Sequence, residues 1–90
     1  MPDISVIQTA ADQYTVQVGD EKSSTVHSVR VKEADVQRLA PDADAVRLIE
    51  ESFRFLLERE PKESILRTFD LPVIARYFPE YEAQIRSRLS

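Results

Sequence analysis

The first third of the chain alternates between apolar and polar side chains with the period of two that is typical of β-strands. The clearest case is residues 14–18, where every second side chain from Tyr14 to Val18 is apolar. Residues 4–8 and 25–31 have a similar β-branched, apolar character. Because the loops between these runs are short, the pattern predicts an antiparallel β-meander of three strands at about residues 4–8, 14–18 and 25–31.

After residue 31 the apolar positions recur with the period of a helix. Residues 32–40 predict a short helix, and residues 43–60 predict a long amphipathic helix that Pro61 ends. One face of this long helix is apolar and is expected to cover the sheet. The residues on that face are Ala45, Val46, Ile49, Phe53, Leu56 and Leu57.

Leu48 and Phe55 lie on a flank of the same helix, away from the middle of the apolar face. This second apolar strip needs a cover of its own. The run ESILRTFDLPVIARYFPEYE, residues 63–82, is dense in aliphatic and aromatic side chains and is the natural candidate.

Pro61, Pro72 and Pro79 divide the C-terminal third, because proline biases the residue before it away from the α conformation. We expect three short helices there, at about residues 62–68, 71–78 and 79–89. The fold class predicted from the whole pattern is α+β, with residues 1–90 forming a single domain.

Composition supports a globular protein, since 42% of the residues are hydrophobic and 31% are charged. There is no apolar run near the ~20 residues needed to span a bilayer. The first ten residues lack the basic region and apolar core of a signal peptide. We therefore expect a cytoplasmic protein that has no membrane association.

The inventory of reactive residues is small: the chain has no cysteine, one histidine (His27) and one glycine (Gly19). Thiolate chemistry and glycine-rich phosphate loops are thereby excluded. His27 has no nucleophile or orienting carboxylate that the sequence assigns to it, and a partly covered strand histidine explains it better than a general base. The expectation is a protein that is not an enzyme and that uses no metal or cofactor.

Charge disfavours nucleic-acid binding, because the net charge is −4. Residues 1–61 carry seven basic against twelve acidic side chains, whereas residues 62–90 carry five against four. Residues 62–78 nevertheless have the pattern of a helix–turn–helix, with Arg76 and Tyr77 on its second helix. A helix–turn–helix-like nucleic-acid-binding protein is therefore the alternative function.

The leading expectation is a non-enzymatic protein-interaction or regulatory module. Aromatic and arginine side chains are the usual anchors of interfaces. The open edges of a small sheet also invite strand pairing, so the partner is another protein or a second copy in a homodimer. The candidate partner-binding residues are Phe55, Arg67, Arg76, Tyr77, Tyr81 and Arg86.

The run FLLEREPKESILRTFDLPVIARYFPEYE, residues 55–82, resembles a segment of small, functionally uncharacterised bacterial proteins, in which it follows a β-rich N-terminal part. It covers about a third of the chain. The resemblance implies a bacterial and cytoplasmic protein. It implies no activity, cofactor or catalytic residue.

Overall fold

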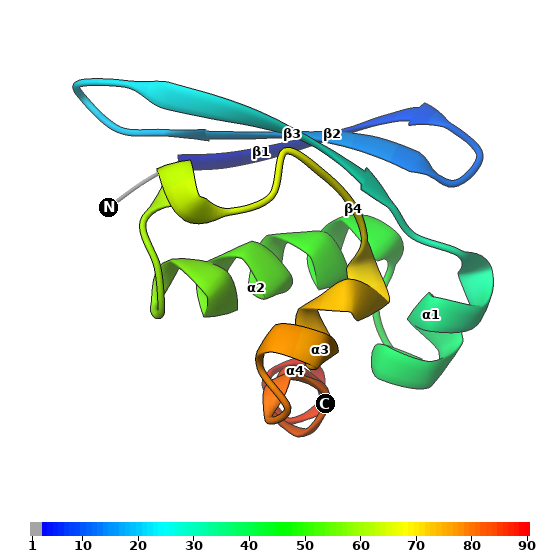
Figure 1. Cartoon of the computed structure of the whole chain (residues 1–90). Coiled ribbons are helices and arrows are strands. Elements are labelled where there is room, and N and C mark those ends of the chain that lie inside the picture. Colours follow the sequence, from blue (N-terminus) through cyan, green and yellow to red (C-terminus); the bar gives the residue numbers. More distant parts are fainter. Residues whose placement is uncertain (1–2) are drawn as a thin grey trace.

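The computed structural model describes residues 3–90 and has an α+β fold, in which helices cover one face of a four-stranded sheet (Figure 1). The predicted antiparallel meander is present, and each strand starts at least one residue before the predicted position. Its strands are β1 (Asp3–Ala10), β2 (Gln13–Gly19) and β3 (Ser24–Arg30). In their register Val6 lies opposite Val16, and Val16 lies opposite His27, so all three side chains belong to the covered face.

A fourth strand, β4 (Thr68–Asp70), lies parallel to β3 and was not predicted. It replaces the end of the helix expected at residues 62–68, where only a 3₁₀ turn, η1 (Lys62–Ser64), forms. The backbone N–H of Ser28 donates to the carbonyl of Arg67 at 2.7 Å, and Phe69 packs on Phe53 with ring centroids 6.1 Å apart. The strand therefore depends on partners remote in sequence, which the local pattern does not reveal.

Helices α1 (Glu33–Leu39) and α2 (Ala45–Leu57) follow the meander, close to the predicted bounds. Asp44 caps α2, because its carboxylate accepts a hydrogen bond from the backbone N–H of Arg47 at 2.8 Å. In Figure 1, α2 runs beneath the sheet, and the C-terminal helices lie on its other side. Ile49 and Phe53 are fully buried as predicted, whereas Val46 is exposed, which corrects its assignment to the covered face.

The second cover predicted over Leu48 and Phe55 is confirmed, since both side chains are fully buried and Phe55 contacts the C-terminal segment. That segment continues after β4 as a 3₁₀ turn and two helices. They are η2 (Leu71–Val73), α3 (Ile74–Tyr77) and α4 (Tyr81–Leu89). The helices expected at 71–78 and 79–89 correspond to η2 with α3 and to α4.

The predicted helix–turn–helix over residues 62–78 is wrong. Its first half is a 3₁₀ turn and a β-strand, and α3 has four residues, too few for a recognition helix. Leu71 and Ile74, at the start of the supposed second helix, are buried in the core and cannot contact DNA bases.

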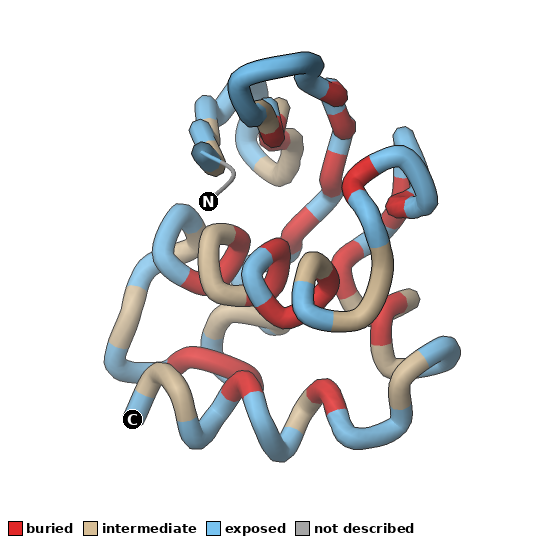
Figure 2. The backbone as a smooth tube through the Cα atoms, turned by 90° about the vertical axis from the view of Figure 1, so that its left-hand side faces the viewer, coloured by how far each residue is buried: buried red, intermediate tan, exposed pale blue. Residues whose placement is uncertain are grey.

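The buried residues form one cluster between the sheet and the helices. Figure 2 shows buried positions in strands and helices alike, with exposed positions at the turns. No helix or strand within residues 3–90 covers the other face of the sheet, and Ile7 and Val26 are exposed on it. None of the helices in residues 3–90 is long and apolar enough to cross a membrane.

Candidate functional site

An apolar groove opens on the surface between the end of α2, the chain that precedes β4, and α3. Its cavity volume is about 160 Å³. We call it the Tyr77 groove, after its most exposed side chain. It is lined by Leu56, Glu60, Ser64, Ile65, Leu66, Phe69, Val73, Ile74, Tyr77 and Phe78.

Tyr77 and Leu66 are the two large side chains of the groove that face solvent, with exposed fractions of 65% and 46%. Tyr77 ends α3, and Leu66 lies in the extended chain that leads to β4. Because successive side chains of an extended chain point to opposite sides, Ile65 is buried while Leu66 is exposed. The groove therefore offers one aromatic and one aliphatic side chain to a partner.

His27 holds the wall that carries Leu66. Its Nδ1 lies 2.8 Å from the carbonyl oxygen of Leu66, and its Nε2 lies 2.8 Å from the hydroxyl of Thr25. Since a carbonyl only accepts, Nδ1 carries the proton and Nε2 accepts from Thr25. Burial lowers the pKa of His27 and so favours the neutral ring. The neutral ring can make both hydrogen bonds in this arrangement. His27 is thus a fully buried structural residue.

The floor of the groove is continuous with the aromatic core. Phe78 meets the ring of Phe55 edge to face, with centroids 5.9 Å apart, and Phe55 meets Tyr81 at 5.3 Å. The guanidinium carbon of Arg59 lies 3.6 Å from the centroid of the Phe55 ring. This packing holds Phe78 against the aromatic core.

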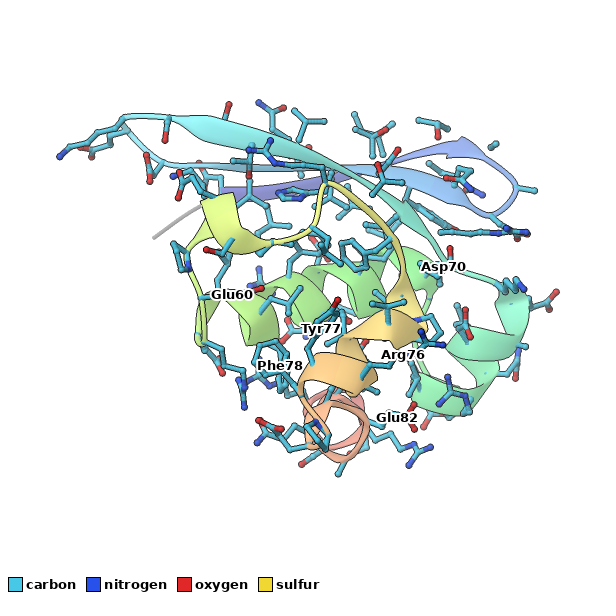
Figure 3. The ribbon with its side chains drawn as sticks, in the orientation of Figure 1. Glu60, Asp70, Arg76, Tyr77, Phe78 and Glu82 are labelled. Carbon is cyan, nitrogen blue, oxygen red and sulfur yellow. The ribbon has the colours of Figure 1, made fainter. Side chains whose placement is uncertain are left out.

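Glu60 is the single charged residue in the lining. Its backbone N–H donates to the carbonyl of Leu56 at 2.9 Å, which holds it in the turn that follows α2. Burial raises the pKa of its carboxyl group. Figure 3 shows Glu60, Tyr77 and Phe78 in the region between α2 and α3, with Arg76 on the side of α3 that is nearer α1.

The structure separates the predicted partner-binding residues into two groups. Phe55 and Tyr81 are fully buried, so the expectation that they anchor a partner at the surface is corrected. The physical reason is that α4 packs against α2, where the Tyr81 hydroxyl lies 2.6 Å from Ser52 Oγ. One consequence of this burial is that the pKa of Tyr81 is raised.

The other four candidates, Arg67, Arg76, Tyr77 and Arg86, are exposed, but they do not form one surface. Only Tyr77 lines the groove. Arg86 forms an ion pair with Glu82 at 3.8 Å and donates a hydrogen bond to the carbonyl of Arg38 at 3.2 Å. Arg67 and Arg76 make no ion pair within residues 3–90.

Sequence reasoning missed Glu60 and Leu66 as members of a site. In the sequence, Glu60 was interpreted as the end of a helix before Pro61. Leu66 was interpreted as an apolar residue of the helix predicted at residues 62–68. An unexpected strand at residues 68–70 turned this helix into extended chain and so brought Leu66 to the surface.

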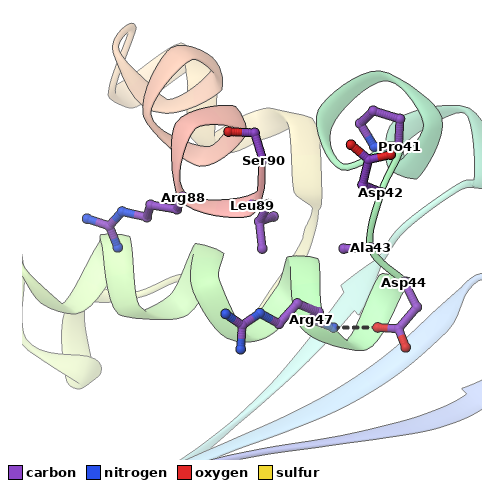
Figure 4. A pocket seen from close by; sticks show the side chains of 8 residues that line it. All are labelled: Pro41, Asp42, Ala43, Asp44, Arg47, Arg88, Leu89 and Ser90. Carbon is purple, nitrogen blue, oxygen red and sulfur yellow. Dashed lines mark hydrogen bonds between the residues drawn. The ribbon is translucent and has the colours of Figure 1, made fainter.

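A second hollow lies between the loop before α2 and the end of α4 (Figure 4). Its lining is mostly polar, and the carboxylate of Asp44 is already used to cap α2. The residues described by the structure contain no group of three or more His, Cys, Asp or Glu side chains that could hold a metal ion. We therefore take the Tyr77 groove as the candidate site.

Comparison of the chain with protein-family models, with curated proteins and with solved structures finds no match. The resemblance of residues 55–82 to small bacterial proteins stays a prediction.

Proposed function

We propose that the protein is a non-enzymatic protein-interaction module and that the Tyr77 groove is its binding surface. The observation that carries the proposal is the exposure of Tyr77 and Leu66 in the lining of an apolar groove. Large apolar side chains that gather at the surface around a depression are typical of binding sites. Tyrosine is also among the residues enriched at the energetic centres of interfaces.

The non-enzymatic part of the proposal rests on the chemistry of the lining. The groove carries one carboxylate, one serine hydroxyl and the phenol of Tyr77, and both ring nitrogens of His27 are engaged in hydrogen bonds elsewhere. General acid–base or nucleophilic catalysis needs a nucleophile and a base within hydrogen-bond reach of each other. An apolar lining instead favours recognition of an apolar side chain.

The test begins with affinity purification of interaction partners from cells that express the protein. A partner retained by the wild type is then produced in pure form, and its dissociation constant is measured by calorimetry. We expect Tyr77→Ala to weaken binding about tenfold or more, as for the loss of an interface anchor. Val26→Ala, on the opposite face of the molecule, is the matched control and should leave the affinity unchanged.

A direct partner that binds Tyr77→Ala and Leu66→Ser as tightly as the wild type would contradict the proposed surface. Thermal unfolding of both variants completes the design. Both side chains are largely exposed, so their replacement should change the stability by less than about 0.5 kcal/mol.

Self-association is a second candidate function, and the edge strand β1 favours it. This strand is eight residues long, pairs on one side only, and has no charged side chain between Ile4 and Ala10. Long uncharged edge strands tend to pair with further strands. The dependence of the molecular mass on protein concentration tests this candidate.

The alternative function, nucleic-acid binding, was inferred from a helix–turn–helix pattern, and residues 62–78 do not form that motif. A titration with DNA and RNA at low salt remains its direct test. Binding that disappears in Arg76→Ala would revive it.

A further inference from the structure

The size of the Tyr77 groove limits what it can hold. Its volume is about 160 Å³, similar to the roughly 150 Å³ of an engineered protein cavity that binds benzene. Sites for drug-sized ligands and cofactors are larger, about 300–1,000 Å³. The groove therefore fits one large apolar side chain, of the size of phenylalanine or leucine, and the rest of a partner must lie outside it.

Glu60 lines this groove, and no basic side chain of residues 3–90 forms an ion pair with it. Among residues 3–90, Arg59 pairs with Glu58 and Glu80 at 3.3 and 3.2 Å. Lys62 pairs with Asp20 and Glu63 at 2.9 and 3.0 Å. The basic side chains next to Glu60 in the sequence are thus bound by other carboxylates.

The other basic residues close to this end of α2 are also paired, Arg54 with Glu51 and Arg88 with Glu58. Glu60 itself makes no ion pair within the described residues. Glu60 is partly buried, and this burial raises the pKa of its carboxyl group. A cation supplied from outside would relieve this cost.

We infer that the partner of the Tyr77 groove is a protein segment in which a large apolar side chain is followed or preceded by an arginine or lysine. The apolar side chain enters the groove between Tyr77 and Leu66, and the cation pairs with Glu60. This inference rests on the proposed function and specifies the chemistry of its partner. The overall negative charge of the protein, −4, favours approach of such a basic segment.

The experiment uses capped tetrapeptides as probes and the full chain labelled with ¹⁵N. One pair is acetyl-Ser-Phe-Arg-Ser-amide and the same peptide with Gln in place of Arg. A second pair has the two central residues in reverse order. Binding is followed by the shifts of the backbone amide signals of Ile65, Leu66 and Tyr77 in a millimolar titration.

We expect at least one arginine peptide to bind with a dissociation constant about two- to fivefold lower than its glutamine counterpart, the gain typical of a partly exposed ion pair. Glu60→Gln should abolish this difference between the arginine and glutamine peptides. Glu50→Gln removes the same charge from α2 outside the groove lining and should preserve the difference.

The possible failures are distinguishable. Equal affinity for arginine and glutamine peptides, or a preference that survives in Glu60→Gln, would overturn the role of Glu60 and leave the groove as an apolar interaction site. Absence of shifts at the groove with every peptide would contradict the groove itself as the binding surface. Shifts in Tyr77→Ala equal to those of the wild type would contradict it as well.

Discussion

A single buried hydroxyl pair joins α2 to α4. Ser52 donates to the carbonyl of Leu48 at 2.7 Å, so its oxygen is free to accept the hydroxyl of Tyr81 at 2.6 Å. Both residues are fully buried. The two hydroxyls are therefore not equivalent: Ser52 keeps a partner if Tyr81 is removed, whereas Tyr81 loses its partner if Ser52 is removed.

This asymmetry predicts unequal mutational costs. Tyr81→Phe should lower the free energy of unfolding by about 1 kcal/mol, the value of one hydrogen bond. Ser52→Ala should cost more, about 1–3 kcal/mol, because it leaves a buried hydroxyl unsatisfied. The double variant should cost less than the sum of the two. Urea unfolding of the three variants measures this, and strictly additive costs would show that the hydroxyls do not interact.

His27 makes the stability depend on pH. Its pKa is 6.5 in a free side chain, and burial lowers it in the folded protein. Below pH 6.5 the unfolded chain binds a proton that the folded chain does not bind until the lowered pKa is reached. The contribution of His27 is thus complete above pH 6.5 and is lost as the pH falls.

We expect the free energy of unfolding of the wild type to decrease between about pH 7.5 and 5.5, above the range in which most carboxylates titrate. His27→Gln retains hydrogen-bonding groups without titrating, so its stability should be lower but nearly constant over this range. Urea titrations at four pH values make the comparison. Equal slopes for wild type and variant would exclude His27 as the source.

At the scale of elements, α2 is apolar on two sides, which makes it the centre of the fold. Phe53 faces the sheet, with its ring centroid 5.3 Å from that of His27, and Phe55 faces the C-terminal segment. Phe55 thus joins α2 to the last third of the chain, together with the Ser52–Tyr81 hydroxyl pair.

Phe55→Ala should lower the free energy of unfolding by about 3–5 kcal/mol, since it removes a fully buried ring and leaves a cavity. Val46→Ala in the same helix is the control and should cost less than about 0.5 kcal/mol, because Val46 is 37% exposed. Chemical denaturation of the wild type and both variants measures these differences in the free energy of unfolding. A cost for Phe55→Ala as small as that of the control would mean that α4 does not seal this side of α2.

At the scale of the whole molecule, the sheet is covered on one face and open along β1. Ile7, in the middle of β1, is 61% exposed. Antiparallel pairing of two copies through β1 would bring no like charges together over residues 4–10. Such pairing would continue the sheet across the two copies.

If β1 mediates self-association, sedimentation equilibrium should show a mass that rises with concentration, and Ile7→Lys should restore the monomer by placing a charge on the edge. Val26→Lys adds the same charge to the same face, but on β3, which β2 separates from β1. It should leave edge pairing intact. A wild-type protein that is monomeric at all concentrations would remove this candidate.

The three antiparallel strands, the two-sided helix α2 and the helix α4 were predictable because each follows from neighbours in the sequence. Alternation from Tyr14 to Val18 and the helical spacing of Leu48 and Phe55 are local signals, and they agree with the packing. Asp44 before α2 is equally local. Of the candidate site, only Tyr77 was among the predicted residues.

The local pattern of apolar and polar residues thus determined the class of the fold, the antiparallel meander and the need for a second set of residues that covers α2. The tertiary structure decided the rest. Residues 68–70 become a strand only because β3 offers them a parallel edge, and this pairing turns Leu66 outward while His27 holds its carbonyl. The burial of Tyr81 and the exposure of Tyr77 are likewise decided by their neighbours in space, since the two tyrosines are only four positions apart in the sequence.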